Sequence, residues 1–148
     1  MKINRLILTM LLALSSYTAL TAEYAVIVNK DNGENVDVRS RFLLQQGSDK
    51  WGSGGEVLPF EIDEGGSIKN LLIKKAFLKE ILGMSGKSEY DKYWTDQKSA
   101  GRTVTPTKVK SFKKILRYVK RESGGIGYAP LKKARKAGVK IIKKFVVN

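Results

Sequence analysis

The stretch VKSFKKILRYVKRESGGIGYAP, residues 109–130, decides the fold, because it places an amphipathic helix directly before a short apolar strand. Its apolar residues recur at helical spacing, and the lysines and arginines between them fall on the opposite face. We predict a helix from Thr107 or Lys108 to the break at 123–125, followed by a buried strand over residues 126–130. The apolar face of this helix comprises Val109, Phe112, Ile115, Leu116 and Val119.

On either side of this stretch, strands and helices alternate. A buried strand is predicted over residues 24–29. An alternating strand is predicted over residues 56–62, in which Pro59 favours an edge position or a bulge. Ser67 is a good N-cap for a helix that ends before Gly83. The apolar face of that helix is expected to contain Ile68, Leu71, Leu72, Lys75, Phe77, Leu78, Ile81 and Leu82. Further helices are predicted at 36–44, 88–98 and 131–137, with a last strand at 139–147.

Strands separated by helices predict an α/β domain with a mixed or largely parallel sheet flanked by helices. The chain has 148 residues, 42% of them apolar, which is close to the globular norm of about 45%. Residues 23–148 are expected to form this single domain.

The first 22 residues are typical of a secretory signal peptide. Lys2 and Arg5 precede an apolar run at 6–14, and small residues lead to Ala22. That run is too short to span about 30 Å of hydrocarbon, although an uncleaved membrane anchor stays the alternative. Cleavage after Ala22 predicts a periplasmic protein.

The net charge of +14 comes from the C-terminal third. Residues 101–148 contain 15 Lys or Arg residues and one acid, Glu122. This asymmetry predicts an anionic partner such as membrane headgroups or an acidic protein. A solvated face that only keeps the protein soluble is the alternative. Nucleic acid is not expected, because few aromatic residues alternate with the basic ones. The expected basic surface comprises Lys110, Lys113, Lys114, Arg117, Lys120 and Arg121.

The absence of Cys and His excludes several chemistries. A disulfide framework, a thiolate nucleophile, a Ser-His dyad and an ordinary zinc site all need one of these residues. One S-x-x-K match at 111–114 is what chance gives in a chain this rich in lysine. We therefore expect neither an enzyme nor a cofactor or metal.

A turn at Glu64-Gly65-Gly66-Ser67 precedes the second predicted helix. Glycines expose backbone N–H groups, and a helix N-terminus carries about half a positive charge, so such a turn can hold an oxyanion. The candidate ligands are Gly65, Gly66 and Ser67, with Lys69 adding charge. A plain helix cap is the alternative.

The order of several landmarks resembles a known family. These are Tyr24–Asn29, then Trp51, Gly55 and Pro59, then Glu64–Ser67, Phe77, Leu82 and Gly83, then Tyr93, Trp94, Gly101 and Pro106, and finally Gly124–Tyr128. Together they resemble the short exported proteins related to phosphate-binding components of ABC transporters, in the periplasmic-binding-protein-like superfamily. The resemblance implies a single lobe of the type II fold, a small oxyanion as ligand and an ABC permease as partner.

Two differences from the family limit the expected ligand binding. The chain matches only one of the family's two lobes, and an acid occupies the position of the arginine in the family's phosphate loop. Asp63 and Glu64 would each repel a dianion by about 1 kcal/mol at close range, so tight phosphate binding is not expected. The other function left open is an interaction module whose basic end docks on an anionic membrane or protein surface.

Overall fold

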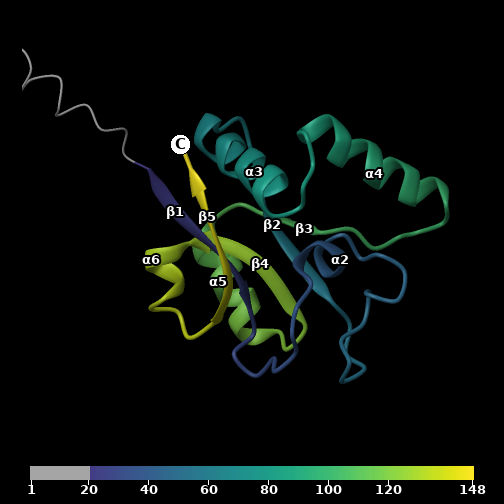
Figure 1. Cartoon of the computed structure of the whole chain (residues 1–148), viewed down its shortest axis with the longest axis horizontal. Coiled ribbons are helices and arrows are strands. Elements are labelled where there is room, and N and C mark those ends of the chain that lie inside the picture. The colour runs from purple at the N-terminus through teal and green to yellow at the C-terminus, as the bar shows by residue number, and fades with distance from the viewer. Residues whose placement is uncertain (1–20) are drawn as a thin grey trace, which may run out of the picture.

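A five-stranded mixed sheet organises the protein in the computed structural model, which describes residues 21–148 (Figure 1). The strand order is β3-β2-β4-β1-β5; β3, β2 and β4 run parallel, and β1 is antiparallel to both of its neighbours. The α/β class predicted from the sequence is therefore confirmed. The strands are β1 (Ala22–Val28), β2 (Leu58–Ile62), β3 (Thr107–Val109), β4 (Gly125–Pro130) and β5 (Lys140–Val147). The helices are α2 (Val38–Phe42), α3 (Ile68–Glu80), α4 (Lys87–Ser99), α5 (Phe112–Arg121) and α6 (Leu131–Ala134).

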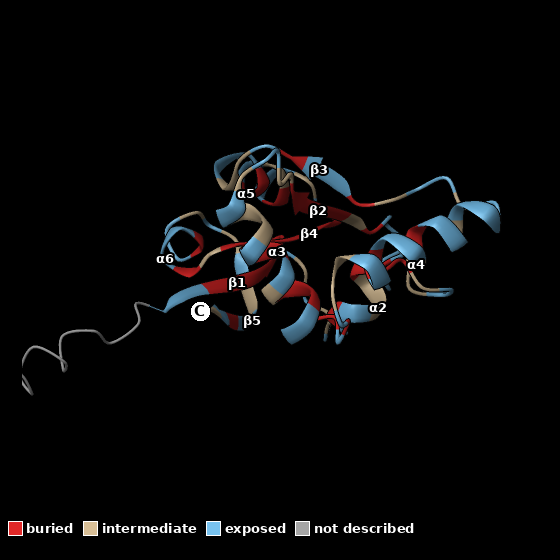
Figure 2. Cartoon of the chain, turned by 90° about the horizontal axis from the view of Figure 1, so that it is seen from above, coloured by how far each residue is buried: buried red, intermediate tan, exposed pale blue. Residues whose placement is uncertain are grey.

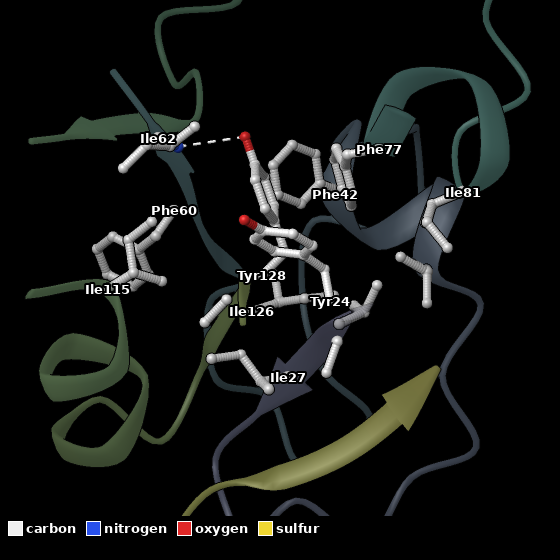
Figure 3. Close-up of a cluster of buried hydrophobic side chains, with 14 of the residues drawn as sticks. Tyr24, Ile27, Phe42, Phe60, Ile62, Phe77, Ile81, Ile115, Ile126 and Tyr128 are labelled. Atoms are coloured by element: carbon white, nitrogen blue, oxygen red, sulfur yellow. Dashed lines mark hydrogen bonds between the residues drawn. The ribbon is translucent and has the colours of Figure 1, made fainter. Parts of the chain in front are cut away.

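One face of β4 packs against α2 and α3 through Tyr128 (Figure 3). The ring of Tyr128 stacks on Phe77 of α3, with centroids 4.2 Å apart, and lies 6.4 Å from the ring of Phe42 in α2. The tyrosine is fully buried, yet its hydroxyl accepts a hydrogen bond from the backbone N–H of Ile62 at 3.2 Å. The hydroxyl of Tyr128 thus links the aromatic core to β2 and has a hydrogen-bond partner although it is buried.

The opposite face of β4 packs against α5 through Gly127. A Cβ at this position would lie 3.0 Å from the side chain of Ile115 and 3.2 Å from the carbonyl oxygen of Phe60, so a larger residue would require these neighbours to shift. Successive strand residues point to opposite faces of the sheet, so Gly127 faces α5 whereas Tyr128 faces α2 and α3. Figure 2 shows the central strands buried in red, with exposed blue surfaces on the helices.

The predicted start of the basic helix is wrong. Thr107–Val109 forms the edge strand β3, paired in parallel with Phe60–Ile62, and α5 begins only at Phe112. Ser111 is the N-cap, and its hydroxyl accepts a hydrogen bond from the backbone N–H of Lys114 at 3.2 Å. Lys110 therefore lies in the link between strand and helix. The spacing between Val109 and Phe112 fits one face of a helix, but the pairing of β3 with β2 determines the conformation of Val109.

Of the two alternatives for Pro59, an edge position or a bulge, the edge position is wrong, because β2 lies between β3 and β4. The N–H of Leu58 donates to Gly124 O, toward β4. Alternation along the strand directs the next backbone nitrogen toward β3, whose pairing with β2 begins only at Phe60. No carbonyl oxygen of the sheet therefore needs a hydrogen bond from the position of Pro59, which has no N–H.

The α3 helix has the expected ends, and the predicted apolar residues Phe77, Leu78, Ile81 and Leu82 are buried, but Lys75 is exposed. Ser67 accepts a hydrogen bond from the N–H of Asn70 as N-cap, and Gly83 beyond the helix has a φ of 65° in the left-handed region. Ile68 and Leu72, predicted on the apolar face, are 75% and 45% exposed. Ile73 and Lys74 are buried instead, and Lys74 is only 2% exposed because Glu61 and Glu64 pair with it.

Most of the expected signal peptide lies outside the described residues, since the description begins at Thr21 and β1 begins at Ala22. Within residues 21–148, every helix is too short or too polar to cross a bilayer. The assignment of residues 1–22 to a signal peptide stays a prediction.

Candidate functional site

The outward side of α5 is uniformly basic. Its Lys and Arg side chains are exposed, whereas Ile115, Leu116 and Val119 on the inward side are buried against the sheet. The four-residue helix α6 adds further exposed cations next to α5. We call this surface the basic face; it comprises Lys113, Lys114, Arg117, Lys120 and Arg121 of α5 and Lys132, Lys133, Arg135 and Lys136 in and after α6.

A hollow of about 430 Å³ lies within the basic face, between α5 and α6. We call it the α5–α6 groove. Leu116 and Ala137 supply its apolar surface. Lys120 reaches toward the segment after α6, and a Cβ added at Gly138 would lie 3.6 Å from its Cε. The groove is lined by Lys113, Leu116, Arg117, Lys120, Lys133 and Ala137.

The cations of the α5–α6 groove have no acidic partner within residues 21–148. Glu122, the C-cap residue of α5 and the one acid in residues 101–148, is paired with Arg121 at 3.1 Å instead. Four positive charges thus share one hollow without neutralisation, which raises the local positive potential. An anion that enters the groove relieves this repulsion.

The Gly65-Gly66 turn is built largely from its own hydrogen bonds. The N–H of Gly65 donates to Asp63 Oδ1 at 3.2 Å, and the N–H of Ser67 donates to the carbonyl oxygen of Glu64. The hydroxyl of Ser67 is engaged as the N-cap of α3. Of the two backbone N–H groups predicted for an oxyanion, those of Gly65 and Gly66, the one of Gly65 is therefore used inside the turn. Gly65 and Gly66 have φ values of 50° and 78°, which is why glycine is needed there.

A hollow of about 410 Å³ beside this turn brings together only part of the predicted oxyanion site. Gly65 and Ser67 line it, whereas Gly66 and the exposed Lys69 do not. Lys110, which the sequence placed on the basic helix, supplies the cation instead. The full lining is Asp63, Glu64, Gly65, Ser67, Asn70 and Lys110.

The repulsion expected from two carboxylates beside the turn is reduced in the structure. Glu64 Oε1 lies 3.1 Å from Lys74 Nζ, and this lysine is buried under α3. The charge of Glu64 is therefore partly compensated within the protein, because Lys74 is shared with Glu61. Asp63 remains as the acid that faces an incoming anion, and Lys110 offsets it.

A buried charged cluster joins α3, α4 and β2, and the predicted site residues did not include it. Lys74 Nζ lies 3.5 Å from Glu61 Oε2 and 5.1 Å from the ring centre of Tyr90. The hydroxyl of Tyr90 donates to Glu61 Oε2 at 2.6 Å. Burial raises the pKa of Glu61 although Lys74 and Tyr90 oppose the shift, and burial also raises the pKa of Tyr90. Among the described residues Lys74 is the one cation paired with Glu61 and Glu64, and the hydrogen bond from Tyr90 to Glu61 links α4 to β2.

One sequence signal for this cluster was present. Lys74 stands three and four residues before Phe77 and Leu78, which is the spacing of a shared helix face. Glu61 likewise stands between apolar residues of a strand. The distance along the chain from Glu61 to Tyr90 conceals their contact, because only the packing of α4 on β2 brings them together.

Comparisons with protein families, with curated proteins and with solved structures found no match for this chain. The resemblance to phosphate-binding components of ABC transporters stays a prediction from the sequence motifs. Within residues 21–148, the structure contains no group of three or more acidic side chains positioned to hold a metal ion.

Proposed function

We propose that this chain is an exported, non-enzymatic protein that docks on an anionic membrane through its basic face. The observation that carries the proposal is the exposure of nine cations over α5 and α6, with Glu122 as the one acid in residues 101–148. Export follows the signal-peptide pattern of the first 22 residues and places the protein in the periplasm. Each Lys or Arg near an anionic bilayer contributes about 1 kcal/mol of attraction.

Removing three charges from the basic face should weaken membrane binding strongly. We expect the triple variant Lys113→Gln, Lys114→Gln, Arg117→Gln to lose about 3 kcal/mol of binding free energy, or roughly 100-fold in affinity. These side chains are exposed, so the fold should be kept. Co-sedimentation with vesicles rich in phosphatidylglycerol measures the partition.

The matched control removes the same charge elsewhere. Lys75, Lys79 and Lys98 are exposed on α3 and α4, away from the basic face, and have no acidic partner within 4 Å among the described residues. Their Gln variants should bind the vesicles nearly as well as the unmodified protein. Equal losses in the two triple variants would show that net charge alone, and no particular face, governs binding.

A second candidate function is the binding of a small oxyanion at the turn before α3, in the manner of a phosphate carrier that delivers its ligand to an ABC permease. Two contacts favour it: Glu64 is turned inward to Lys74, and Lys110 lines the hollow beside Ser67. Asp63 opposes it, so affinity should be modest.

Calorimetry with phosphate and sulfate tests this second function. Ser67→Ala should weaken any binding by about 1–2 kcal/mol, because one hydrogen bond to a charged group is lost. Ser111→Ala is the control, since it removes the equivalent N-cap of α5 and leaves the turn intact. A folded sample that releases no heat at millimolar anion would remove the oxyanion hypothesis.

A further inference from the structure

We propose that the α5–α6 groove is a specific site for one lipid molecule with a phosphomonoester headgroup. This inference rests on the proposed function, because it uses the same basic face. The proposed function needs only the attraction of this face to an anionic surface, whereas the inference adds one lipid bound in the groove. Three properties of the groove carry it: its apolar floor, its unpaired cations and its size.

The floor of the groove is apolar, which simple electrostatic docking does not require. Leu116 and Ala137 face the hollow, and Leu116 remains 8% exposed there. The aliphatic stems of the surrounding Lys and Arg side chains extend this surface while their charged ends stay in water. An apolar chain lying on this floor would be removed from water at a gain of about 25 cal/mol per Å².

The four cations on the rim of the groove favour a phosphate group that carries two negative charges. Lys113, Arg117 and Lys120 follow one another at the i, i+4, i+7 spacing of a single α5 stripe, and Lys133 lies opposite them at α6. Phosphate oxygens accept several charge-assisted hydrogen bonds at once, and the planar fork of Arg117 matches two of them. A phosphodiester carries one charge and compensates less of the repulsion among the four cations.

The groove has room for a ligand larger than the free anion. Its volume of about 430 Å³ falls within the range of about 300–1,000 Å³ typical of small-molecule sites. Inorganic phosphate would reach the cationic rim but leave the apolar floor in contact with water. A phosphorylated lipid uses the rim and the floor together.

Calorimetry with single-chain lipids below their micelle concentration tests the site on the whole protein. Lysophosphatidic acid is the probe, and lysophosphatidylglycerol, lysophosphatidylcholine and inorganic phosphate are the comparisons. We expect lysophosphatidic acid to bind at least about tenfold more tightly than each comparison, because it alone combines a dianionic phosphate with a chain.

Two variants separate seating in the groove from attraction to the face. Ala137→Leu fills the floor and keeps every charge, so it should weaken lysophosphatidic acid binding about tenfold or more while partition to anionic vesicles changes little. Ala100→Leu, an exposed substitution after α4, is its control. The double variant Lys120→Gln, Lys133→Gln removes two exposed rim charges and should weaken binding of lysophosphatidic acid. This test does not depend on Ala137→Leu, which could unfold the protein.

The outcomes distinguish this inference from the proposed function. Vesicle binding without tighter binding of lysophosphatidic acid than of lysophosphatidylglycerol would overturn the inference and leave the docking function intact. Binding of lysophosphatidic acid without binding to anionic vesicles would overturn the docking function and support the groove. Unchanged lysophosphatidic acid binding in the Lys120→Gln, Lys133→Gln variant would also overturn the inference.

Discussion

Gly124→Ala should prevent stable folding or lower the free energy of unfolding by more than about 4 kcal/mol. A Cβ at Gly124 would lie 1.9 Å from the carbonyl oxygen of Glu56 and 3.3 Å from Nε1 of Trp51. The carbonyl of Gly124 also accepts hydrogen bonds from Trp51 Nε1 at 3.0 Å and from Leu58 N at 2.9 Å. Any shift that makes room for the methyl group therefore breaks the start of the β2–β4 pairing.

Urea denaturation followed by far-UV circular dichroism measures the effect of Gly124→Ala. Gly33→Ala is the control, because a Cβ there meets nothing within 4 Å and its φ lies outside the left-handed region. We expect the control to stay within about 0.5 kcal/mol of the unmodified protein. Equal midpoints for the two variants would show that Gly124 does not set the approach of β2 to β4.

Lys74→Met should lower the free energy of unfolding by about 3–5 kcal/mol, because it leaves buried carboxylates without their counter-charge. Lys74 is 2% exposed and lies within 3.5 Å of Glu61 and 3.1 Å of Glu64. Methionine fills much of the same volume, so the loss reports charge more than packing. Thermal or urea denaturation near neutral pH measures it.

Two further variants identify the cause of the loss at Lys74. Lys75→Met changes the next residue, which is exposed, and should have almost no effect on stability. Adding Glu61→Gln to Lys74→Met removes one of the stranded carboxylates and should recover part of the lost stability. A double variant no more stable than Lys74→Met would contradict the assignment of the loss to Glu61.

The features that the sequence predicted correctly are local ones. Ser67 and Gly83 mark the ends of α3, and the alternation of apolar and basic residues in α5 follows from its contact with the sheet. The α/β class follows from the order of such segments. Each of these signals lies within about two helical turns of sequence, where spacing alone determines the environment.

The features that the sequence did not predict depend on partners far along the chain. The three residues of β3 have no periodicity of their own, and their pairing with Phe60–Ile62 defines them. Lys74 becomes buried because Glu61 and Glu64 meet it from β2 and the following turn. Lys110 lies beside the Gly65 turn because β3 ends there. Such contacts depend on the assembled sheet, which local patterns do not encode.

The candidate sites show the same division. Exposure of the α5 cations could be predicted from helical spacing, but the α5–α6 groove could not, because α6 and residues 135–138 complete it. The turn at 64–67 was predicted to hold an oxyanion from its glycines and its N-cap. Its internal hydrogen bonds, from Gly65 to Asp63 and from Ser67 to Glu64, became known only with the fold.

Salt-dependent binding of the unmodified protein to anionic vesicles tests the proposed function most directly. Co-sedimentation at rising sodium chloride should show strong partition to phosphatidylglycerol vesicles at 0.1 M that falls steeply toward 1 M, as the Debye length shrinks from about 10 Å to about 3 Å. Neutral phosphatidylcholine vesicles should retain little protein at any salt concentration. Partition that is equal on the two kinds of vesicle, or that does not change with salt, would contradict docking through the basic face.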